Sequence, residues 1–275
     1  MGMVYGDLFM RVLFATRPYE KVPGSANELF EKWSEIAKKN VKSGSMGHYK
    51  KNLKSIVEAF DELPLIEGMV KPKVGVVGEI LVKYHPTANN DIVGIIEKEG
   101  GEAVVLDLID FFLYGMYSEE YNFKHLSGKY STMLINKWAI KFFEKYRKHA
   151  RDALSSSKRF EQPLFIGQIA ERAKRLLSLG NQYGEGWLLT GEMIDLIDHG
   201  VENIACLQPF ACLPNHVTGK GMIKALRKYN PLANIVAIDY DPGASDVNQL
   251  NRIKLMMATA YKNMSDGAAS QGAAT

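Results

Sequence analysis

Apolar residues in the first part of the chain recur at helical spacing. The stretches 27–40 (NELFEKWSEIAKKN) and 52–63 each carry a hydrophobic residue every three or four positions, which is typical of an amphipathic helix. Between them, SGSMG at residues 43–47 has the composition of a loop. Residues 1–70 are therefore predicted to form a helical part, either a subdomain or the end of a domain whose strands lie outside this chain.

From residue 74 onward, short Val-rich and Ile-rich runs alternate with helical segments. Four runs predict buried strands, at residues 74–80, 102–108, 203–208 and 234–241. Helices are predicted at residues 89–101, 130–180 with a break near 155–157, 184–200, 218–229, and from a cap at Ser245 to about Tyr261. Strands joined by helical crossovers predict a parallel sheet with right-handed connections.

The predicted fold class is therefore α/β, with a flavodoxin-like or Rossmann-like sheet over residues 71–262 and the helical part before it. The last residues, 263–275, are small and polar, and such a composition predicts a disordered tail.

Composition narrows the class of protein without naming a function. The chain has 275 residues, of which 46% are hydrophobic and 24% charged, as is usual for a soluble globular protein. A net charge of +3 gives no reason to expect nucleic acid as a partner. No apolar run approaches the ~20 residues that span a bilayer, and two cysteines are too few for a disulfide framework. We expect a cytoplasmic protein without a membrane partner.

The charge is distributed unevenly. Residues 137–175 contain eleven Lys and Arg against four Asp and Glu, a net +7, which leaves −4 for the remainder of the chain. This segment is a candidate surface for an anionic partner, although solvated helix faces also produce such runs.

Ligands of open parallel sheets bind beyond the carboxyl ends of the strands. The loops to consider are therefore residues 78–91, 107–118, 208–220 and 240–246. In the first loop, Glu79 is either an acid/base group or, as we favour, a cap for a neighbouring amide. TGKGM at 218–222 lacks the GxxxxGK[ST] pattern of a phosphate loop, so nucleotide hydrolysis is not expected.

Both cysteines lie in one stretch, CLQPFACLPNH, at residues 206–216. Cys206 alternates with apolar residues inside a predicted strand, and the favoured interpretation is a small buried side chain. Cys212 lies in the loop between two prolines, where a thiolate could bind iron or zinc. The C-x₅-C spacing matches no common zinc or ferredoxin pattern, and His216 could add a ligand.

Three stretches carry a resemblance to a known family: PKVGVVGEILVKYHPTANNDIV, GEGWLLTGEMIDLIDHGVENIACLQPFACLPNHVTGKGMIKALR and NIVAIDYDPGASDVNQLNRIKLM. They closely resemble the C-terminal part of the large 2-hydroxyacyl-CoA dehydratase activase-related proteins, as does GDLFMRVLFATRPYE near the start. These proteins are similar to the iron–sulfur subunits of 2-hydroxyglutaryl-CoA dehydratase and benzoyl-CoA reductase. The resemblance covers about residues 5–260.

The resemblance implies roles for particular residues. In the wider superfamily, cysteines from different loops hold a [4Fe–4S] cluster, and an ATP-driven activase delivers the electron for chemistry on an acyl-CoA thioester. Cys212 lies at the matching motif position for one cluster ligand, and Cys206 is a second candidate. Asn215 and His216 are candidate hydrogen-bond donors for a developing oxyanion. The cysteine-bearing second domain and the ATP-binding domains of the large relatives have no counterpart here.

Three functions remain open at this stage, one of which is a free-standing acyl-CoA-binding domain whose basic helices contact the CoA phosphates. Another is a fragment of an iron–sulfur dehydratase or reductase component that contributes cluster ligands and a surface for acyl-CoA or a partner. By itself, such a fragment is expected to be inactive, since its partners would be the activase and the missing cysteine-bearing domain. The alternative is a non-catalytic module that docks the activase or the dehydratase and whose cysteines are structural.

Overall fold

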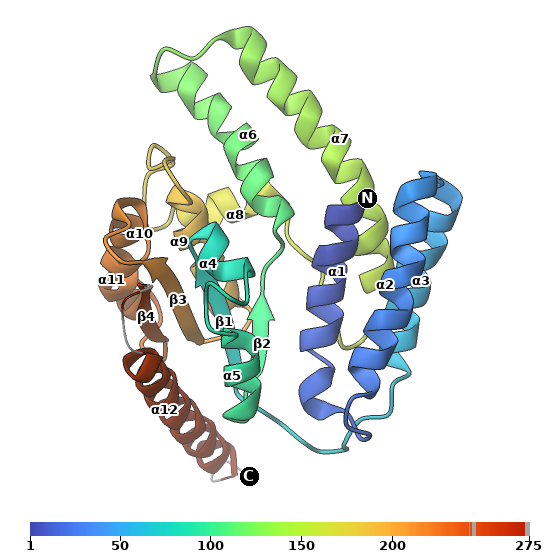
Figure 1. Ribbon diagram of the computed structural model, residues 1–275. Coiled ribbons are helices and arrows are strands. Elements are labelled where there is room, and N and C mark those ends of the chain that lie inside the picture. Colours follow the sequence, from blue (N-terminus) through green and yellow to red (C-terminus); the bar gives the residue numbers. More distant parts are fainter. Residues whose placement is uncertain (242, 244–245, 273–275) are drawn as a thin grey trace. The chain divides into compact units, whose positions relative to one another are not determined.

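The chain forms two compact units, each assembled from two separate stretches of sequence (Figure 1). The computed structural model describes residues 1–241, 243 and 246–272. Unit 1 comprises Met1–Met69 and Leu106–Gly167, and unit 2 comprises Val70–Val105 and Gln168–Thr275. The range predicted for the α/β domain, 71–262, thus includes 62 residues that belong to unit 1.

Unit 1 is helical, as the sequence predicted for its first part. Its elements are α1 (Gly2–Phe14), a short 3₁₀ helix (Arg17–Tyr19), α2 (Ser25–Ser43), α3 (Met46–Asp61), α6 (Ile109–His125) and α7 (Tyr130–Leu154). The apolar stripes of the first helices are buried against one another, with Val12, Leu53 and Phe60 fully inaccessible. A short connection makes α6 and α7 an antiparallel pair (Figure 1).

A buried ionic network joins the elements of unit 1. Asp107 accepts hydrogen bonds from Arg11 at 2.6 Å and from Arg147 at 3.0 Å. Burial alone would raise the pKa of Asp107, but the two guanidinium groups lower it to about 2. Asp7 accepts from two backbone N–H groups at the start of α6, at 2.9 and 3.2 Å. Burial raises the pKa of Asp7 well above its usual value, and the Asp107 carboxylate adds to the effect.

Unit 2 contains a four-stranded, all-parallel sheet, which confirms the predicted fold class. The strands are β1 (Lys73–Gly78), β2 (Glu102–Val105), β3 (Asn203–Pro209) and β4 (Asn234–Tyr240), in the order β2-β1-β3-β4. Register pairs include Val74 with Ala103 and Cys206 with Ala237. This order is the one that the first four strands of a flavodoxin-like sheet adopt.

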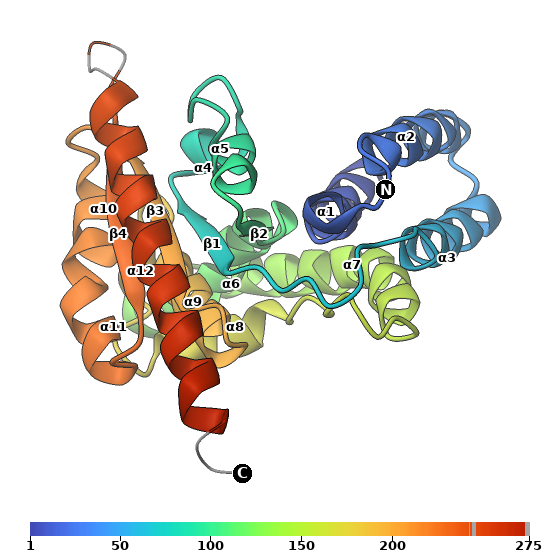
Figure 2. The same cartoon turned by 90° about the horizontal axis from the view of Figure 1, so that it is seen from below.

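Helices connect the strands of unit 2. They are α4 (Ile80–Tyr84), α5 (Ile92–Lys98), α8 (Ile166–Ala173), which begins at the end of unit 1, α9 (Gly186–Asp198), α10 (Leu213–Thr218), a 3₁₀ turn (Lys220–Met222), α11 (Ile223–Tyr229) and α12 (Asp246–Gly272). Figure 2 shows α5 and α9 on opposite sides of the sheet. α12 lies beside α5, since Lys254 approaches Glu99 at 3.9 Å. Covering both faces explains why the strands are continuous apolar runs.

Gly78 permits the close approach of the two central strands. It ends β1 with a φ of +148°, and a Cβ there would lie 2.0 Å from the backbone oxygen of Leu207 in β3. Only glycine adopts this conformation without strain. The glycine therefore lets β1 end directly against β3, and Glu79 follows at the edge of the sheet.

Some elements differ from the sequence prediction. The helices α4, α6 and α10 were not predicted, because α4 and α10 are only five and six residues long and α6 lacks a capping side chain. α12 is assigned through Gly272, whereas the sequence predicted a disordered tail from residue 263. The predicted cap, Ser245, lies outside the described residues. No helix in the described part of the chain is both long and apolar enough to cross a bilayer.

Candidate functional site

The strand order reverses between β1 and β3, and this point defines the candidate site. From β1 the chain crosses to β2 on one side, whereas from β3 it crosses to β4 on the other. Connections that diverge from neighbouring strands leave a crevice at the carboxyl edge, where ligands of such sheets bind. The residues that follow these two strands are Glu79 and the loop of residues 210–212, so the sequence placed its candidates at this edge.

Cys212 is held in a defined loop. Its backbone N–H donates to the oxygen of Pro209 at 3.2 Å, and Phe210 N–H donates to the oxygen of Tyr240 at 3.2 Å. Ala211 between them has a φ of +59°, which is uncommon for a residue with a Cβ. The Cys212 side chain is partly exposed, and the residue precedes the first turn of α10. The loop therefore keeps this thiol at the surface of the sheet edge.

Asn215 lies directly beneath the Cys212 thiol. Its side-chain Nδ2 donates to Cys212 Sγ at 3.3 Å. The residue is 0% exposed, and its Oδ1 is buried without a hydrogen-bond partner among the described residues. The His216 ring contacts the backbone at the start of its own helix, with Nδ1 2.9 Å from the backbone oxygen of Cys212. Both candidates lie inside α10, not at the start of the helix predicted to begin at Thr218.

Cys206 differs from Cys212 in its burial. It is fully buried in β3, and burial raises the pKa of its thiol to about 12. A Cβ on Gly219 would lie 3.0 Å from its sulfur, so the α10 turn covers the thiol closely. This environment matches the packing role favoured from the sequence, and it keeps the thiol protonated.

Glu79 and Glu185 contact the start of α4 with their carboxylates. Glu79 accepts from Val82 N–H at 2.9 Å, the capping role favoured from the sequence. Glu185 accepts from Ile80 N–H at 3.0 Å. Burial raises the pKa of Glu185, and the hydrogen bonds from Ile80 and from the Asn215 side chain oppose that rise. Glu185 thus links the α4 end of the site to Asn215.

Sequence reasoning missed Glu185 and a buried ion pair beside it. Lys83 Nζ lies 2.8 and 3.0 Å from the two carboxylate oxygens of Glu192, and both side chains are almost fully inaccessible. The sequence could have indicated this pair, because Lys83 is the single charged residue in the apolar segment ILVKY and Glu192 is the single charged residue in WLLTGEMI. Such charges are rarely buried unless they are paired.

A second polar cluster lies at the ends of β3 and β4. Gln208 Nε2 donates to Asp239 at 2.5 Å, and Lys220 lies 3.5 Å from the same carboxylate. Gln208 is fully buried, and its Oε1 has no hydrogen-bond partner in the described part of the chain. Asp241 accepts from Gly243 N–H at 3.0 Å, which is a local turn contact.

The residues present do not fit a complete iron–sulfur cluster. Among the described residues, no group of three or more His, Cys, Asp or Glu side chains is arranged to hold a metal ion. A four-iron cluster requires several thiolates, and of the two thiols in this chain one is packed in the core. Cys212 is the single thiol placed to contact a ligand.

Comparison with known proteins adds no identification: no protein-family model, curated protein or solved structure matches the chain.

Proposed function

We propose that the chain is a component of a 2-hydroxyacyl-CoA dehydratase-type iron–sulfur system. In this proposal the Cys212 loop presents one thiol to a site whose other ligands come from a further cysteine-bearing domain or subunit. The observation that carries it is the pair formed by Cys212 and Asn215 at the switch point. The two stretches that resemble the activase-related family at this edge, QPFACLPNH and GEILVKY, are the stretches that build it.

In this proposal, the chain supplies and positions one cluster ligand, the Cys212 thiol. The remaining ligands come from the other domain or subunit. A thiolate bound to a metal retains negative charge, and an N–H donor from the protein stabilises that charge and orients the sulfur. Asn215 supplies such a donor, and its own position is fixed by burial and by Glu185. The Oδ1 of Asn215 is buried without a hydrogen-bond partner among the described residues, so Nδ2 is the atom of this amide that contacts the thiol.

Anaerobic reconstitution with iron, sulfide and excess 2-mercaptoethanol tests this proposal, because the small thiol replaces the missing ligands. We expect iron and acid-labile sulfide in the wild type and in Cys206→Ala, and a loss of both in Cys212→Ser. Equal iron content in the wild type and Cys212→Ser, or no iron in any of the three proteins, would contradict a ligand role for Cys212.

A second candidate is a non-catalytic module that docks the ATP-dependent activase or the dehydratase. The packing of Cys206 favours it, since half of the thiols in the chain are structural. Iron-free protein that still binds a purified activase or dehydratase would select this candidate over the first.

A further inference from the structure

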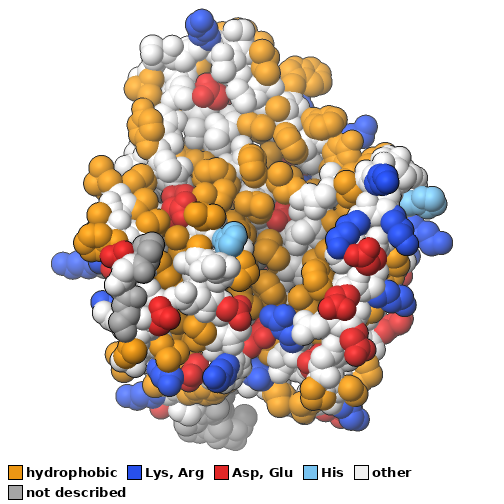
Figure 3. Space-filling view, viewed as in Figure 1, with side chains coloured by type: hydrophobic (Ala, Val, Ile, Leu, Met, Phe, Trp, Pro, Cys, Tyr) orange, Lys and Arg blue, Asp and Glu red, His pale blue; other side chains and the backbone are white. Residues whose placement is uncertain are grey.

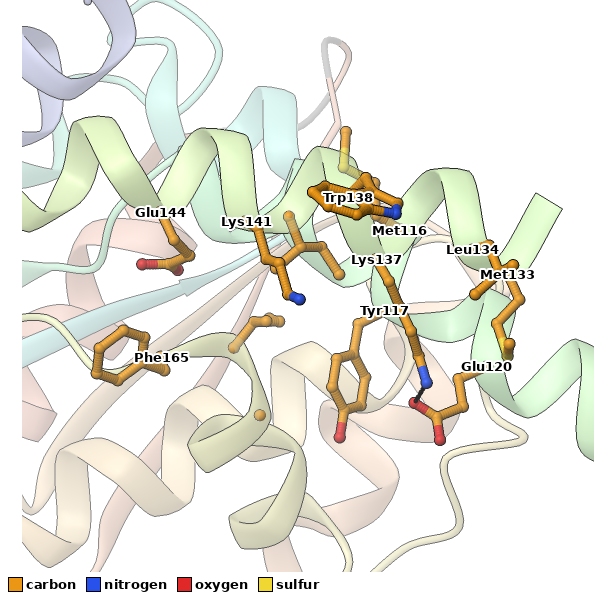
Figure 4. A pocket seen from close by; sticks show the side chains of 13 residues that line it. Met116, Tyr117, Glu120, Met133, Leu134, Lys137, Trp138, Lys141, Glu144 and Phe165 are labelled. Carbon is orange, nitrogen blue, oxygen red and sulfur yellow. Dashed lines mark ion pairs between the residues drawn. The ribbon is translucent and has the colours of Figure 1, made fainter. Parts of the chain in front are cut away.

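Unit 1 carries an open groove between α6 and α7. The groove has a volume of about 400 Å³ and is lined by the facing sides of the two helices and by the residues just before and at the start of α8. Most lining side chains are apolar, among them Met116, Tyr117, Trp138 and Phe165 (Figure 4). The volume lies in the range of ligand pockets, and the groove is partly open to solvent.

The apolar surface continues from the groove along α7. Ile135, Trp138 and Phe142 expose 68%, 72% and 58% of their surfaces, and Figure 3 shows hydrophobic side chains over the α6–α7 hairpin. Positions 135, 138 and 142 have the i, i+3, i+7 spacing of one helix face and span about 10 Å. A contiguous exposed apolar strip of this kind marks an interaction surface. A small molecule in the groove would leave the strip uncovered, whereas a helix laid along α7 would cover both.

The acidic side chains that line the groove are paired with basic residues, whereas one lysine of the lining makes no ion pair among the described residues. Glu120 is paired with Lys137 at 3.1 Å (Figure 4) and with Lys124 at 2.5 Å. Glu144 is paired with Arg147 at 3.1 Å and with Arg151. Both acidic residues of the lining are therefore neutralised inside the unit.

The lysine ammonium groups are less fully neutralised. Lys141 lies 5.2 Å from the centre of the Trp138 ring and makes no ion pair among the described residues. Lys145, one turn further along α7, is exposed to solvent. An occupant that brings carboxylates to this rim would gain ion pairs, whereas one that brings ammonium groups would be repelled.

We propose that this groove binds an amphipathic helix of a protein partner, with apolar side chains against Trp138 and Phe142 and acidic side chains toward Lys141 and Lys145. Helices commonly bind in this way, through apolar anchors at i, i+3, i+4 and i+7. The inference goes beyond the function proposed for Cys212 and holds whether or not that thiol binds iron. The proposal also assigns a role to the first two turns of the positive segment at residues 137–175, which would bind acidic side chains of the partner.

Two synthetic helical peptides of about 18 residues, roughly five turns, serve as probes. Both carry leucines at the anchor spacing, and their other positions are glutamate in one peptide and lysine in the other. Fluorescence anisotropy of dye-labelled peptide measures the affinity for the whole chain. We expect the glutamate peptide to bind at least about tenfold more tightly than the lysine peptide, a difference of about 1.4 kcal/mol.

Variants assign the binding to the groove. Trp138→Ala should weaken the glutamate peptide by about tenfold or more, since exposed aromatic anchors carry much of the energy of such interfaces. Lys141→Glu should reverse the preference in favour of the lysine peptide. Lys42→Glu, an exposed lysine on α2, is the matched control and should leave both affinities unchanged. Circular dichroism verifies that each variant folds.

Several results would overturn the proposal. These are equal binding of the two peptides, failure of either to bind, and an unchanged preference in Lys141→Glu. Saturable binding of laurate in the absence of peptide binding would assign the groove to a small apolar acid instead of a helix. None of these readouts involves iron or a thiol, so a failure here is distinct from a failure of the reconstitution experiment.

Discussion

Lys83 and Glu192 form an ion pair with 2.8 Å between Nζ and Oε1, and their side chains are only 3% and 4% exposed. The pair joins α4 to α9 across residues that are 109 positions apart. Burial raises the pKa of Glu192 even with the ammonium beside it. A buried pair of this kind adds little net stability, because the cost of removing both charges from water offsets their attraction.

Removing one partner of this pair should be more damaging than removing both. Lys83→Met leaves an unpaired buried carboxylate, and we expect it to lower the free energy of unfolding by about 3–5 kcal/mol. The double variant Lys83→Met/Glu192→Leu should recover much of that loss, because no buried charge is left without a partner. Urea unfolding of both variants measures the difference; a double variant less stable than Lys83→Met would contradict this account.

Acid should weaken unit 1 through Asp107. Its pKa is about 2 in the folded chain, against 3.8 for an aspartate without charged or buried surroundings. Because the folded-state pKa is the lower one, the stabilisation is present above pH 3.8 and is lost as the pH falls toward 2. This corresponds to roughly 2 kcal/mol.

The variant Asp107→Asn removes this carboxylate. Because the Asp107 carboxylate also contributes to the raised pKa of Asp7, the comparison with the wild type reports the sum of both effects. The stability difference between the wild type and Asp107→Asn should shrink between about pH 5 and pH 2, as measured by chemical unfolding at each pH. A difference that stays constant over this range would show that Asp107 does not titrate there.

The two thiols should differ in reactivity. Cys212 is partly exposed, whereas Cys206 is fully buried with a pKa of about 12, and a buried, protonated thiol reacts slowly. An aromatic disulfide reagent at about pH 8 should therefore modify one thiol rapidly in the folded chain and both after denaturation. The rapid phase should disappear in Cys212→Ser and remain in Cys206→Ala; the reverse pattern would exclude Cys212 as the accessible thiol.

Glycine substitutions test the contact between the central strands. Gly78→Ala places a Cβ 2.0 Å from a backbone oxygen at a φ of +148°, so we expect a loss of more than about 3 kcal/mol of stability. Gly115→Ala in α6 is the matched control, since nothing lies within 4 Å of its Cβ position. That change should stabilise the protein by about 0.5–1 kcal/mol. Thermal unfolding of both variants measures the contrast.

The strands could be predicted because each is a short run with apolar residues on both faces, as in VGVVG and NIACLQ. Because the carboxyl ends of parallel strands lie at the same edge of a sheet, Glu79 and Cys212 could both be placed at that edge from the sequence alone. The distinction between Cys206 and Cys212 was also accessible, because one alternates with core residues and the other follows Pro209 and Phe210.

Long-range pairings could not be predicted in the same way. Glu185 and Lys83 gain their partners only when segments about 100 residues apart pack together, and periodicity in a single segment carries no information about its partner. The amphipathic pattern of residues 130–154 predicted a helix, but not that this helix packs with α1 and α3.

The alternation of the two units along the chain affects how the protein can form during synthesis. Strand β1 pairs with β3 at Val74 and Asn203, so the centre of the sheet cannot close until the ribosome has made some 130 further residues. In the meantime β1 has only the short strand β2 as a partner, while unit 1 can be completed once residue 167 has been made. Unit 1 is therefore free to fold first, and the nascent β1 and β2 must remain unaggregated until β3 emerges.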